Sequence, residues 1–416
     1  MIIDKLKSAL KYMLVFLKWS ALAVVCGTIG GVIGALFHLS VEWATSLRQS
    51  QDFVILFLPL GGVIIAGLYK LFKVDFSTGT NDVIDSVRME RRLPILIAPL
   101  IFISTVITHL CGGSAGREGA ALQLGGSIGT QIAAVFHLDQ KDKHIMVLCG
   151  MSGVFSALFG TPLTAAVFAP EVISVGIIYF AAFVPCLISA LAGYGISLLF
   201  GAAPTKYVLE SVPNLSVISV IKVVVLAAAL ALVSILFCVA IKSAHKYLCK
   251  YIKNDFVRVA AGGAVIVALT LLLGTRDYNG AGMEVIQNAI NGSALPYAFL
   301  IKILFTAITV GSGFRGGEIV PTFFVGATFG CTLAPIIGLD AGFGAAIGII
   351  ALFCGVVNCP IASIMLSIEL FGSSGLLLFA AAAGVSFILS GYYGLYSSQK
   401  IVYSKLKAEY INVNAK

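Results

Sequence analysis

Long apolar segments separated by short polar breaks run along almost the whole chain. Some of them, such as residues 120–135 and 361–370, are too short or too rich in glycine for an unbroken membrane span. Short, interrupted apolar segments are typical of half-helices held inside protein, where irregular backbone is tolerated. We therefore expect an all-α polytopic membrane protein with many tilted and broken helices. The segments long enough to cross a bilayer as single helices are residues 20–39, 53–69, 223–241, 257–273 and 376–392.

The composition agrees with a membrane location. Of 416 residues, 59% are hydrophobic and 11% are charged, whereas a soluble domain carries about 25% charged residues. The net charge of +8 comes from short breaks and the chain ends, so it does not indicate a nucleic-acid partner. By the positive-inside rule both termini are cytoplasmic and the number of crossings is even. Residues 1–18 are expected to form a basic amphipathic helix along the membrane surface.

The second half of the chain repeats the first weakly. Residues 116–129 (GREGAALQLGGSIG) align with 317–330 (GEIVPTFFVGATFG), and 161–171 (TPLTAAVFAPE) align with 359–369 (CPIASIMLSIE). Such repeats of broken helices are the architecture of secondary transporters, with the binding site at the repeat interface. An odd number of crossings in each half would make the repeats inverted. We divide the chain into residues 1–18, a first membrane repeat at 19–205, a second at 206–403 and a short cytoplasmic tail at 404–416.

A charged break at residues 116–119 (GREG) interrupts the apolar sequence of the first repeat. An ionisable residue deep in a membrane segment is costly, so Glu118 is a candidate functional residue. The flanking glycines let backbone approach a small ligand closely. The apolar stretch that restarts there predicts a helix N-terminus at membrane depth, which attracts anions. Glu118 is then a protonatable anion beside an anion site; the plainer alternative is a structural ion pair, for instance with Arg117.

The second repeat has a similar break at residues 313–321 (GFRGGEIVP). Pro321 fits the first turn of the helix that follows, and Glu318 either acts chemically or only complements the helix dipole. Two weaker candidates lie elsewhere. Asn81 can offer an amide N–H to an anion, although Asn before a helix is ordinary capping chemistry. Tyr396 ends the last apolar segment, where an interfacial tyrosine is the commoner interpretation.

At these breaks the chain resembles the CLC family of anion channels and transporters. The family's motifs are a Gly-Ser-Gly-Ile-Pro turn, a Gly-Lys/Arg-Glu-Gly-Pro turn, a Gly-x-Phe-x-Pro turn and a late tyrosine. All four have counterparts here, in order, across the membrane domain. Asn81 at the first proline position and Ile319 at the phenylalanine position, beside a carboxylate, resemble the fluoride/proton antiporter branch (CLC-F). Ala120 and Val320 depart from that branch's pattern, because a hydroxyl residue is common at both positions.

The resemblance implies a CLC-type inverted repeat that exports fluoride in exchange for protons. It implies a homodimer with one pore per subunit, and the short tail favours a bacterial inner (cytoplasmic) membrane. Glu118 takes the place of the family's gating glutamate and Tyr396 that of its central tyrosine. The proton-relay glutamate of chloride exchangers would fall on Val172, so Glu318 becomes the candidate for a separate proton role.

Fluoride is small and strongly hydrated, so a fluoride site must replace its water shell with directed N–H and O–H donors. Arg117 and Arg315 are expected to raise the local potential rather than to touch the ion. We therefore assign gating and proton transfer to Glu118 and Glu318, and the anion site to Gly79, Thr80, Asn81, Arg117, Gly119, Ile319, Val320 and Tyr396.

Two other functions compete with fluoride export. A chloride/proton exchanger or a passive anion channel shares the same fold, but the missing relay acid and the pair Asn81 and Glu318 favour fluoride. An intramembrane serine protease would use Ser152 in a Gly-x-Ser-Gly pattern with His109 as base, a pattern that arises easily among 44 glycines. The nine cysteines are scattered singly without metal-ligand spacing, so neither a metal nor a cofactor is expected.

Overall fold

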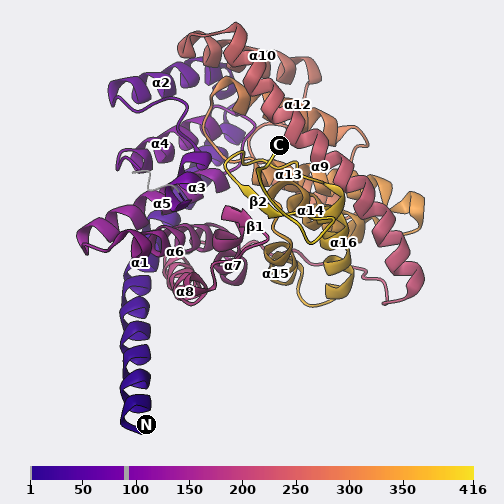
Figure 1. Ribbon diagram of the computed structural model, residues 1–416. Coiled ribbons are helices and arrows are strands. Elements are labelled where there is room, and N and C mark those ends of the chain that lie inside the picture. Colours follow the sequence, from indigo (N-terminus) through magenta and orange to yellow (C-terminus); the bar gives the residue numbers. More distant parts are fainter. Residues whose placement is uncertain (1, 89–92) are drawn as a thin grey trace.

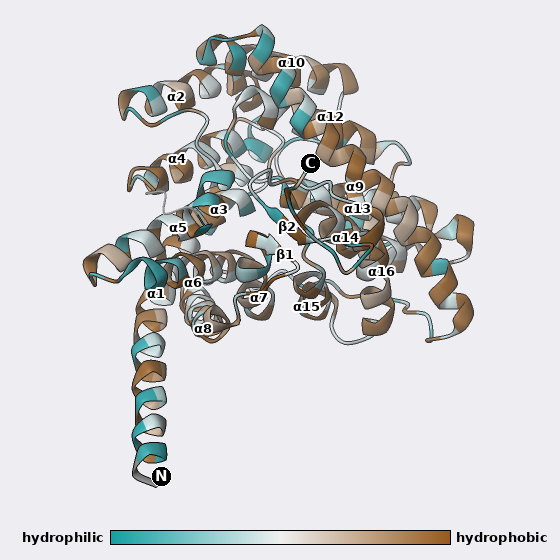
Figure 2. Ribbon diagram, in the orientation of Figure 1, coloured by the Kyte–Doolittle hydropathy of each residue, from teal (hydrophilic) through white to brown (hydrophobic). Residues whose placement is uncertain are grey.

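Helices make up almost all of this computed structural model, which describes residues 2–88 and 93–416. They form one body from which the first helix projects (Figure 1). Hydrophobic residues line the peripheral helices α9 and α16, whereas hydrophilic residues recur along the projecting helix (Figure 2). The α-helices are α1 (Ile2–Ser50), α2 (Leu58–Leu71), α3 (Thr80–Arg88), α4 (Ile97–Leu110), α5 (Glu118–Val135), α6 (Gln140–Phe159), α7 (Pro162–Ile173), α8 (Phe183–Leu199), α9 (Val217–Tyr251), α10 (Asp255–Leu273), α11 (Met283–Ile290), α12 (Ala298–Ser312), α13 (Ile319–Leu333), α14 (Ala341–Val357), α15 (Pro360–Phe371) and α16 (Leu376–Leu389).

Four of the five predicted spans lie within long apolar helices. Six described helical segments are long and apolar enough to cross a membrane, and four of them contain predicted spans. The prediction for residues 376–392 is wrong, because α16 has only 14 residues and the chain turns at Gly391, which has a φ of +57°. Two long segments escaped prediction, at Phe180–Leu199 and Ile319–Ile337, because each includes a short 3₁₀ turn beside its α-helix.

The first helix is continuous from Ile2 to Ser50. The basic helix predicted over residues 1–18 is therefore not a separate element, because from Ile2 onward it continues into the first span. Neither glycine nor proline occurs before Gly27 to interrupt the helix. Near residue 18 the helix meets the start of α6, where Lys18 Nζ lies 2.6 Å from the Asp142 carboxylate.

The two sequence repeats fold as matching helix triplets, α5–α6–α7 and α13–α14–α15. Within each triplet the first two helices touch backbone to backbone. A Cβ on Gly125 would lie 2.2 Å from the Gly150 carbonyl oxygen, and a Cβ on Gly326 would lie 2.2 Å from that of Gly348. Small residues at equivalent positions thus permit the same close approach in both halves.

Each triplet also caps the other. Glu171, near the end of α7, accepts from the Ile361 and Ala362 N–H groups of α15 at 3.0 and 2.8 Å. Glu369, near the end of α15, accepts from the Leu163 and Thr164 N–H groups of α7, both at 2.8 Å. These reciprocal bonds satisfy the free N–H groups of both helix starts and relate the two halves as partners across an internal axis.

The chain end is not a free tail. Strand β2 (Lys400–Tyr403) pairs in parallel with β1 (Ser174–Val175) and antiparallel with β3 (Tyr410–Asn414). Beyond β3, the Lys416 N–H donates to the Tyr392 carbonyl at 2.7 Å, and the Lys416 carbonyl accepts from Gly394 at 3.1 Å. Residues 404–416 therefore pack against the loop that carries Tyr396.

Candidate functional site

The charged breaks of the two repeats meet at the centre of the molecule. Gly116 and Gly317 form an antiparallel bridge in which each N–H donates to the other's carbonyl, at 2.6 and 2.7 Å. A Cβ on Gly317 would lie 2.5 Å from the Gly119 nitrogen, so this contact requires glycine. The bridge brings the N-termini of α5 and α13 together, which concentrates free N–H groups and positive helix ends at one place.

The Glu118 side chain crosses from α5 to the other repeat. Its Oε2 accepts from the Val320 backbone N–H at 3.1 Å, while its Oε1 is buried without a hydrogen-bond partner. The carboxylate lies against Gly116, where a Cβ would come within 2.1 Å of Oε2. A carboxylate therefore occupies the N-terminus of α13, a position suited to an anion.

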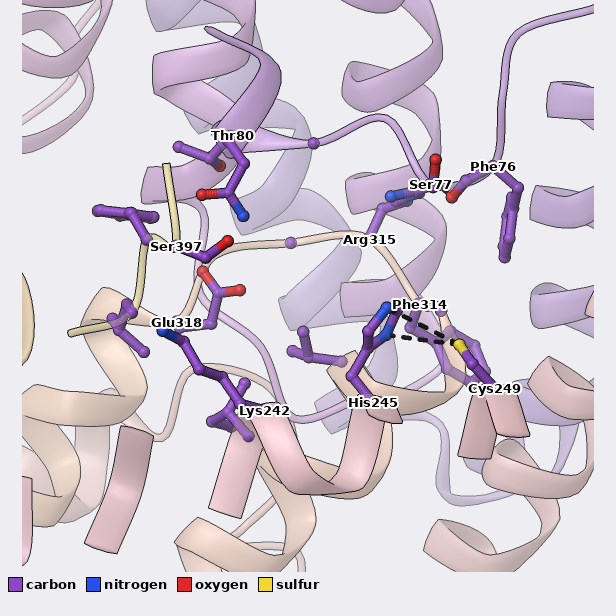
Figure 3. A pocket seen from close by; sticks show the side chains of 18 of the residues that line it. Phe76, Ser77, Thr80, Lys242, His245, Cys249, Phe314, Arg315, Glu318 and Ser397 are labelled. Carbon is purple, nitrogen blue, oxygen red and sulfur yellow. Dashed lines mark hydrogen bonds between the residues drawn. The ribbon is translucent and has the colours of Figure 1, made fainter. Parts of the chain in front are cut away.

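In the repeat alignment Glu318 pairs with Arg117, so it lies one residue before the position equivalent to Glu118. It is the N-cap residue of α13, yet its side chain makes no capping hydrogen bond. It lines a cavity of about 500 Å³ together with residues of α3, α9 and the Tyr396 loop. Figure 3 shows Glu318 among Thr80, Lys242 and Ser397 on the wall of this cavity.

The start of α3 supplies part of the same wall. The Thr80 hydroxyl donates weakly to the Gly119 carbonyl at 3.4 Å. Asn81 Oδ1 accepts from the Ser398 N–H at 3.0 Å, which leaves the Asn81 amide N–H₂ group as its donor. The Gly79 N–H donates to an Asp82 carboxylate oxygen at 2.9 Å, so this N–H group is engaged within the turn, and a role of Gly79 in anion binding stays a prediction.

Tyr396 lies on the cavity wall from a different part of the chain. Its hydroxyl is buried and has no hydrogen-bond partner among the described residues. A buried hydroxyl without a partner is costly in a protein interior, so this group is available to a small ligand. Ile319 is fully buried at the first turn of α13.

The Arg117 guanidinium is bonded to helix α1. Its Nη1 donates to His38 Nδ1 at 2.8 Å, and its Cζ lies 6.0 Å from the Phe159 ring centre. The alternative of a structural ion pair between Arg117 and Glu118 is therefore not the arrangement seen in the described residues.

Two further cationic residues shape this site, and the sequence indicated only the first of them, as a contributor to the local potential. Arg315 stacks over the Tyr69 ring at 4.4 Å and donates to the carbonyls of Phe76 and Thr78, so it fixes the loop before α3. Lys242, on the cavity wall, has a buried Nζ without a hydrogen-bond partner. Only the position of Arg315 beside the GGE break gave a signal in the sequence.

The serine-protease alternative does not fit the contacts. The Ser152 hydroxyl donates to the Ala165 carbonyl at 3.0 Å, and His109 Nε2 contacts the Gly116 carbonyl at 3.2 Å. Ser152 is thus engaged with backbone rather than with a base.

Comparison with known proteins agrees with this architecture. A model of the family described as voltage gated chloride channel matches residues 61–391. A chloride/fluoride channel protein of Pseudomonas syringae pv. tomato is 34% identical over 395 residues, which cover 93% of this chain and 87% of that protein. An H⁺/Cl⁻ exchange transporter ClcA of Vibrio campbellii is 26% identical over 86% of this chain and 82% of its own length.

Solved structures share the fold. The crystal structure of a CLC-type fluoride/proton antiporter matches with a TM-score of 0.89 and 29% identity, over 92% of this chain and 97% of that one. The chain is therefore a multi-pass membrane protein with the CLC fold, and it belongs to the voltage gated chloride channel (CLC) family.

Proposed function

We propose that this protein is a secondary active transporter that exports fluoride in exchange for protons. The observation that carries the proposal is the Glu118 carboxylate bound to the Val320 N–H at the start of α13. A protonatable anion on an anion site competes with the transported ion for that site. The similarity to a chloride/fluoride channel protein and to a fluoride/proton antiporter supports fluoride as the anion.

The proposed cycle follows from the charge of Glu118. Ionised Glu118 holds the α13 helix end and blocks it. A protonated carboxyl group loses most of its attraction for that positive end, so it swings away and the anion takes its place. Its return carries a proton in the opposite direction.

The donors around this point suit a small, strongly hydrated anion. They include the Tyr396 hydroxyl, the Asn81 amide and the backbone N–H groups where α5 and α13 meet. Directed donors replace the water shell of fluoride. Arg117 acts, in this proposal, only through the local potential.

Glu318 is proposed as a second, separate proton-binding acid. Val172 occupies the position of the relay glutamate of chloride exchangers, and its carbonyl accepts from Gln399 Nε2 at 3.0 Å. Glu318 faces the cavity without a capping bond, so it is the acid placed to exchange protons with that cavity.

Fluoride efflux from proteoliposomes tests the function. A fluoride electrode measures release with and without a pH gradient, and a pH dye measures the counter-movement of protons. We expect fluoride release to drive proton uptake and a pH gradient to drive fluoride uphill. Fluoride flux without proton movement would indicate a passive channel, and preferred chloride exchange would indicate a chloride/proton exchanger; either outcome refutes the proposal.

We further propose that both termini face the cytoplasm of a bacterial inner membrane. The Lys18–Asp142 pair gathers the basic lead-in and the charged start of α6 at one end of the molecule, as the positive-inside rule requires. A cysteine introduced at Lys7 should react with an impermeant maleimide in inside-out vesicles and not in right-side-out vesicles.

A homodimer completes the proposal. An apolar groove of about 280 Å³ crosses α7, the start of α8 and α15, and a second copy of the chain is proposed to cover it. A charge at this groove, as in Leu163→Lys, should convert the dimer to a monomer in detergent, measured by light scattering. The groove is lined by Leu163, Ala166, Val167, Pro170, Ile178, Phe180, Phe183, Leu187, Ile361 and Met365.

A further inference from the structure

Two polar residues of α1 reach the arginine that precedes the gate. His38 and Glu42 lie one helical turn apart, and His38 Nε2 is 3.0 Å from Glu42 Oε1. The other imidazole nitrogen, Nδ1, lies 2.8 Å from Arg117 Nη1. The His38 side chain is 5% exposed and that of Glu42 is 58% exposed, so the three groups form a short chain from the surface to the break.

Hydrogen-bond chemistry fixes the proton on His38. A guanidinium group has only donors, so Nδ1 must accept from Arg117. The imidazole proton then lies on Nε2 and is donated to Glu42. This assignment follows from the network and requires a neutral histidine. A second proton, on Nδ1, would set two N–H groups against each other and break the bond to Arg117.

The hydrogen bond between Arg117 and His38 fixes the position of the guanidinium charge. Arginine and carboxylate groups form strong paired bonds when they can reach each other, and Arg117 adjoins Glu118 in sequence. The structure instead gives the guanidinium to His38 and leaves Glu118 on the Val320 N–H. The acceptor on His38 thus competes with Glu118 for the same guanidinium.

We propose that His38, oriented by Glu42, is a positioning residue that holds Arg117 away from Glu118 and releases it when His38 is protonated. The released guanidinium is then free to pair with Glu118 and to slow the gate. This inference rests on the proposed gating role of Glu118, and it adds a pH-sensitive control that the exchange cycle does not itself require.

Few other ionisable groups face this contact. On the Arg117 side they are Glu118, Tyr207 and, on α4, His109. Helix α6 faces His38 with the backbone of Leu158. A neutral Glu42 still accepts a hydrogen bond through its carbonyl oxygen, so the change that breaks the contact is protonation of His38.

Substitution by glutamine separates the two properties of His38. His38→Gln keeps one acceptor and one donor but takes up no proton, whereas His38→Leu keeps neither. The exposed His137 gives a matched control, His137→Gln. Burial and the neighbouring Arg117 charge both favour the neutral imidazole of His38. Fluoride flux is therefore measured from about pH 8 down to about pH 4, which extends below the range in which an exposed histidine changes charge.

We expect wild-type flux to level off or fall at the acid end, while His38→Gln continues to rise. The difference at the acid end should be about fivefold, the size expected when one hydrogen bond is gained or lost. His38→Leu cannot hold Arg117, so it should show at every pH the slow flux that wild type shows at the acid end. His137→Gln should follow wild type. In a Glu118→Gln background, His38→Gln should leave the fluoride flux unchanged at every pH, because the proposed effect of His38 acts through the Glu118 carboxylate.

Identical pH profiles for wild type and His38→Gln would overturn the inference. So would a difference that persists in the Glu118→Gln background. Absence of proton-coupled fluoride flux in wild type would refute the proposed function instead. Imidazole ¹⁵N spectra then test the contact without transport: a bare Nδ1 at neutral pH supports it, and a proton on Nδ1 refutes it.

Discussion

The two charged breaks occupy equivalent places in the two repeats, yet their acids point to different surroundings. Glu118 is the first residue of α5 and its carboxylate reaches the N-terminus of α13. Glu318 is the N-cap of α13, one position earlier, and faces the cavity. One residue turns a helix by about 100°, since a turn takes about 3.6 residues. A shift of one position therefore separates a carboxylate that lies on the N-terminus of α13 from one that lines the cavity.

The strongest way to break this comparison is Glu118→Gln. The amide keeps the size of the side chain but neither ionises nor carries a proton, so proton coupling should disappear while fluoride still moves. Proton uptake during fluoride efflux from proteoliposomes measures this. Glu210→Gln, at an exposed loop position, should leave coupling intact, and coupling that survives in Glu118→Gln would remove Glu118 from the mechanism.

The next largest effect is expected from Gly116→Ala. The new Cβ would lie 2.1 Å from Glu118 Oε2, so the carboxylate must leave its seat. We expect fluoride flux to change by at least about tenfold, the equivalent of roughly 1.4 kcal/mol. Gly195→Ala is the matched control, because a Cβ at that position meets nothing within 4 Å. Equal flux in the two variants would show that Glu118 does not need this seat.

Glu318→Gln tests the other side of the comparison. If Glu318 exchanges protons with the cavity, the amide should slow proton movement or change fluoride-over-chloride selectivity, with the Glu118 gate still in place. Paired electrode and pH-dye traces measure both quantities. Unaltered selectivity together with unaltered coupling would reduce Glu318 to a helix-end charge.

The two halves can also be compared by how much their reciprocal helix caps contribute to the free energy of unfolding. Glu369 accepts from two N–H groups and from the Thr164 hydroxyl at 2.6 Å, whereas Glu171 accepts from two N–H groups. Each glutamine substitution should lower the free energy of unfolding by about 1–2 kcal/mol. The larger loss should fall on Glu369→Gln. Thermal unfolding in detergent measures the order, and the reverse order would contradict it.

The smallest effect concerns the C-terminal hairpin. Lys405 Nζ donates to Asn358 Oδ1 at 2.5 Å and to the Phe387 carbonyl at 2.7 Å. Burial lowers the pKa of Lys405 from 10.5 to about 8. The unfolded chain therefore binds this proton between pH 8 and 10.5 while the folded chain does not, so stability rises with pH in that window. We expect the melting temperature of wild type, relative to that of Lys405→Met, to rise by roughly 1–3 °C across this pH window. The same pH dependence of the melting temperature in both proteins would refute this.

The sequence predicted the fold through properties that are local in the chain. Apolar length gave four of the spans, and glycine and proline marked where helices break. Residues 376–392 failed this test, because their apolar composition concealed a turn at Gly391. The hairpin formed by residues 400–414 was also missed, since its strands are short and β2 pairs with β1 more than two hundred residues earlier.

The candidate site divides in the same way. A costly carboxylate beside a restarting helix singled out Glu118, and the resemblance added Asn81 and Tyr396. The competition between His38 and Glu118 for Arg117 could not be predicted, because α1 meets the break only in three dimensions. The sequence likewise did not reveal that the Asp82 carboxylate accepts from the Gly79 N–H.

By itself, the sequence determined which residues are costly to bury, where helices start, and that the chain is duplicated. These follow from side-chain chemistry and short-range backbone preference. Only the tertiary structure decided that the Glu118 carboxylate seats on the opposite repeat, that Glu318 faces a cavity, and that Arg117 bonds to α1. The reason is that helix ends attract charge whichever segment supplies it, so the partner is chosen by the arrangement of the two repeats in space.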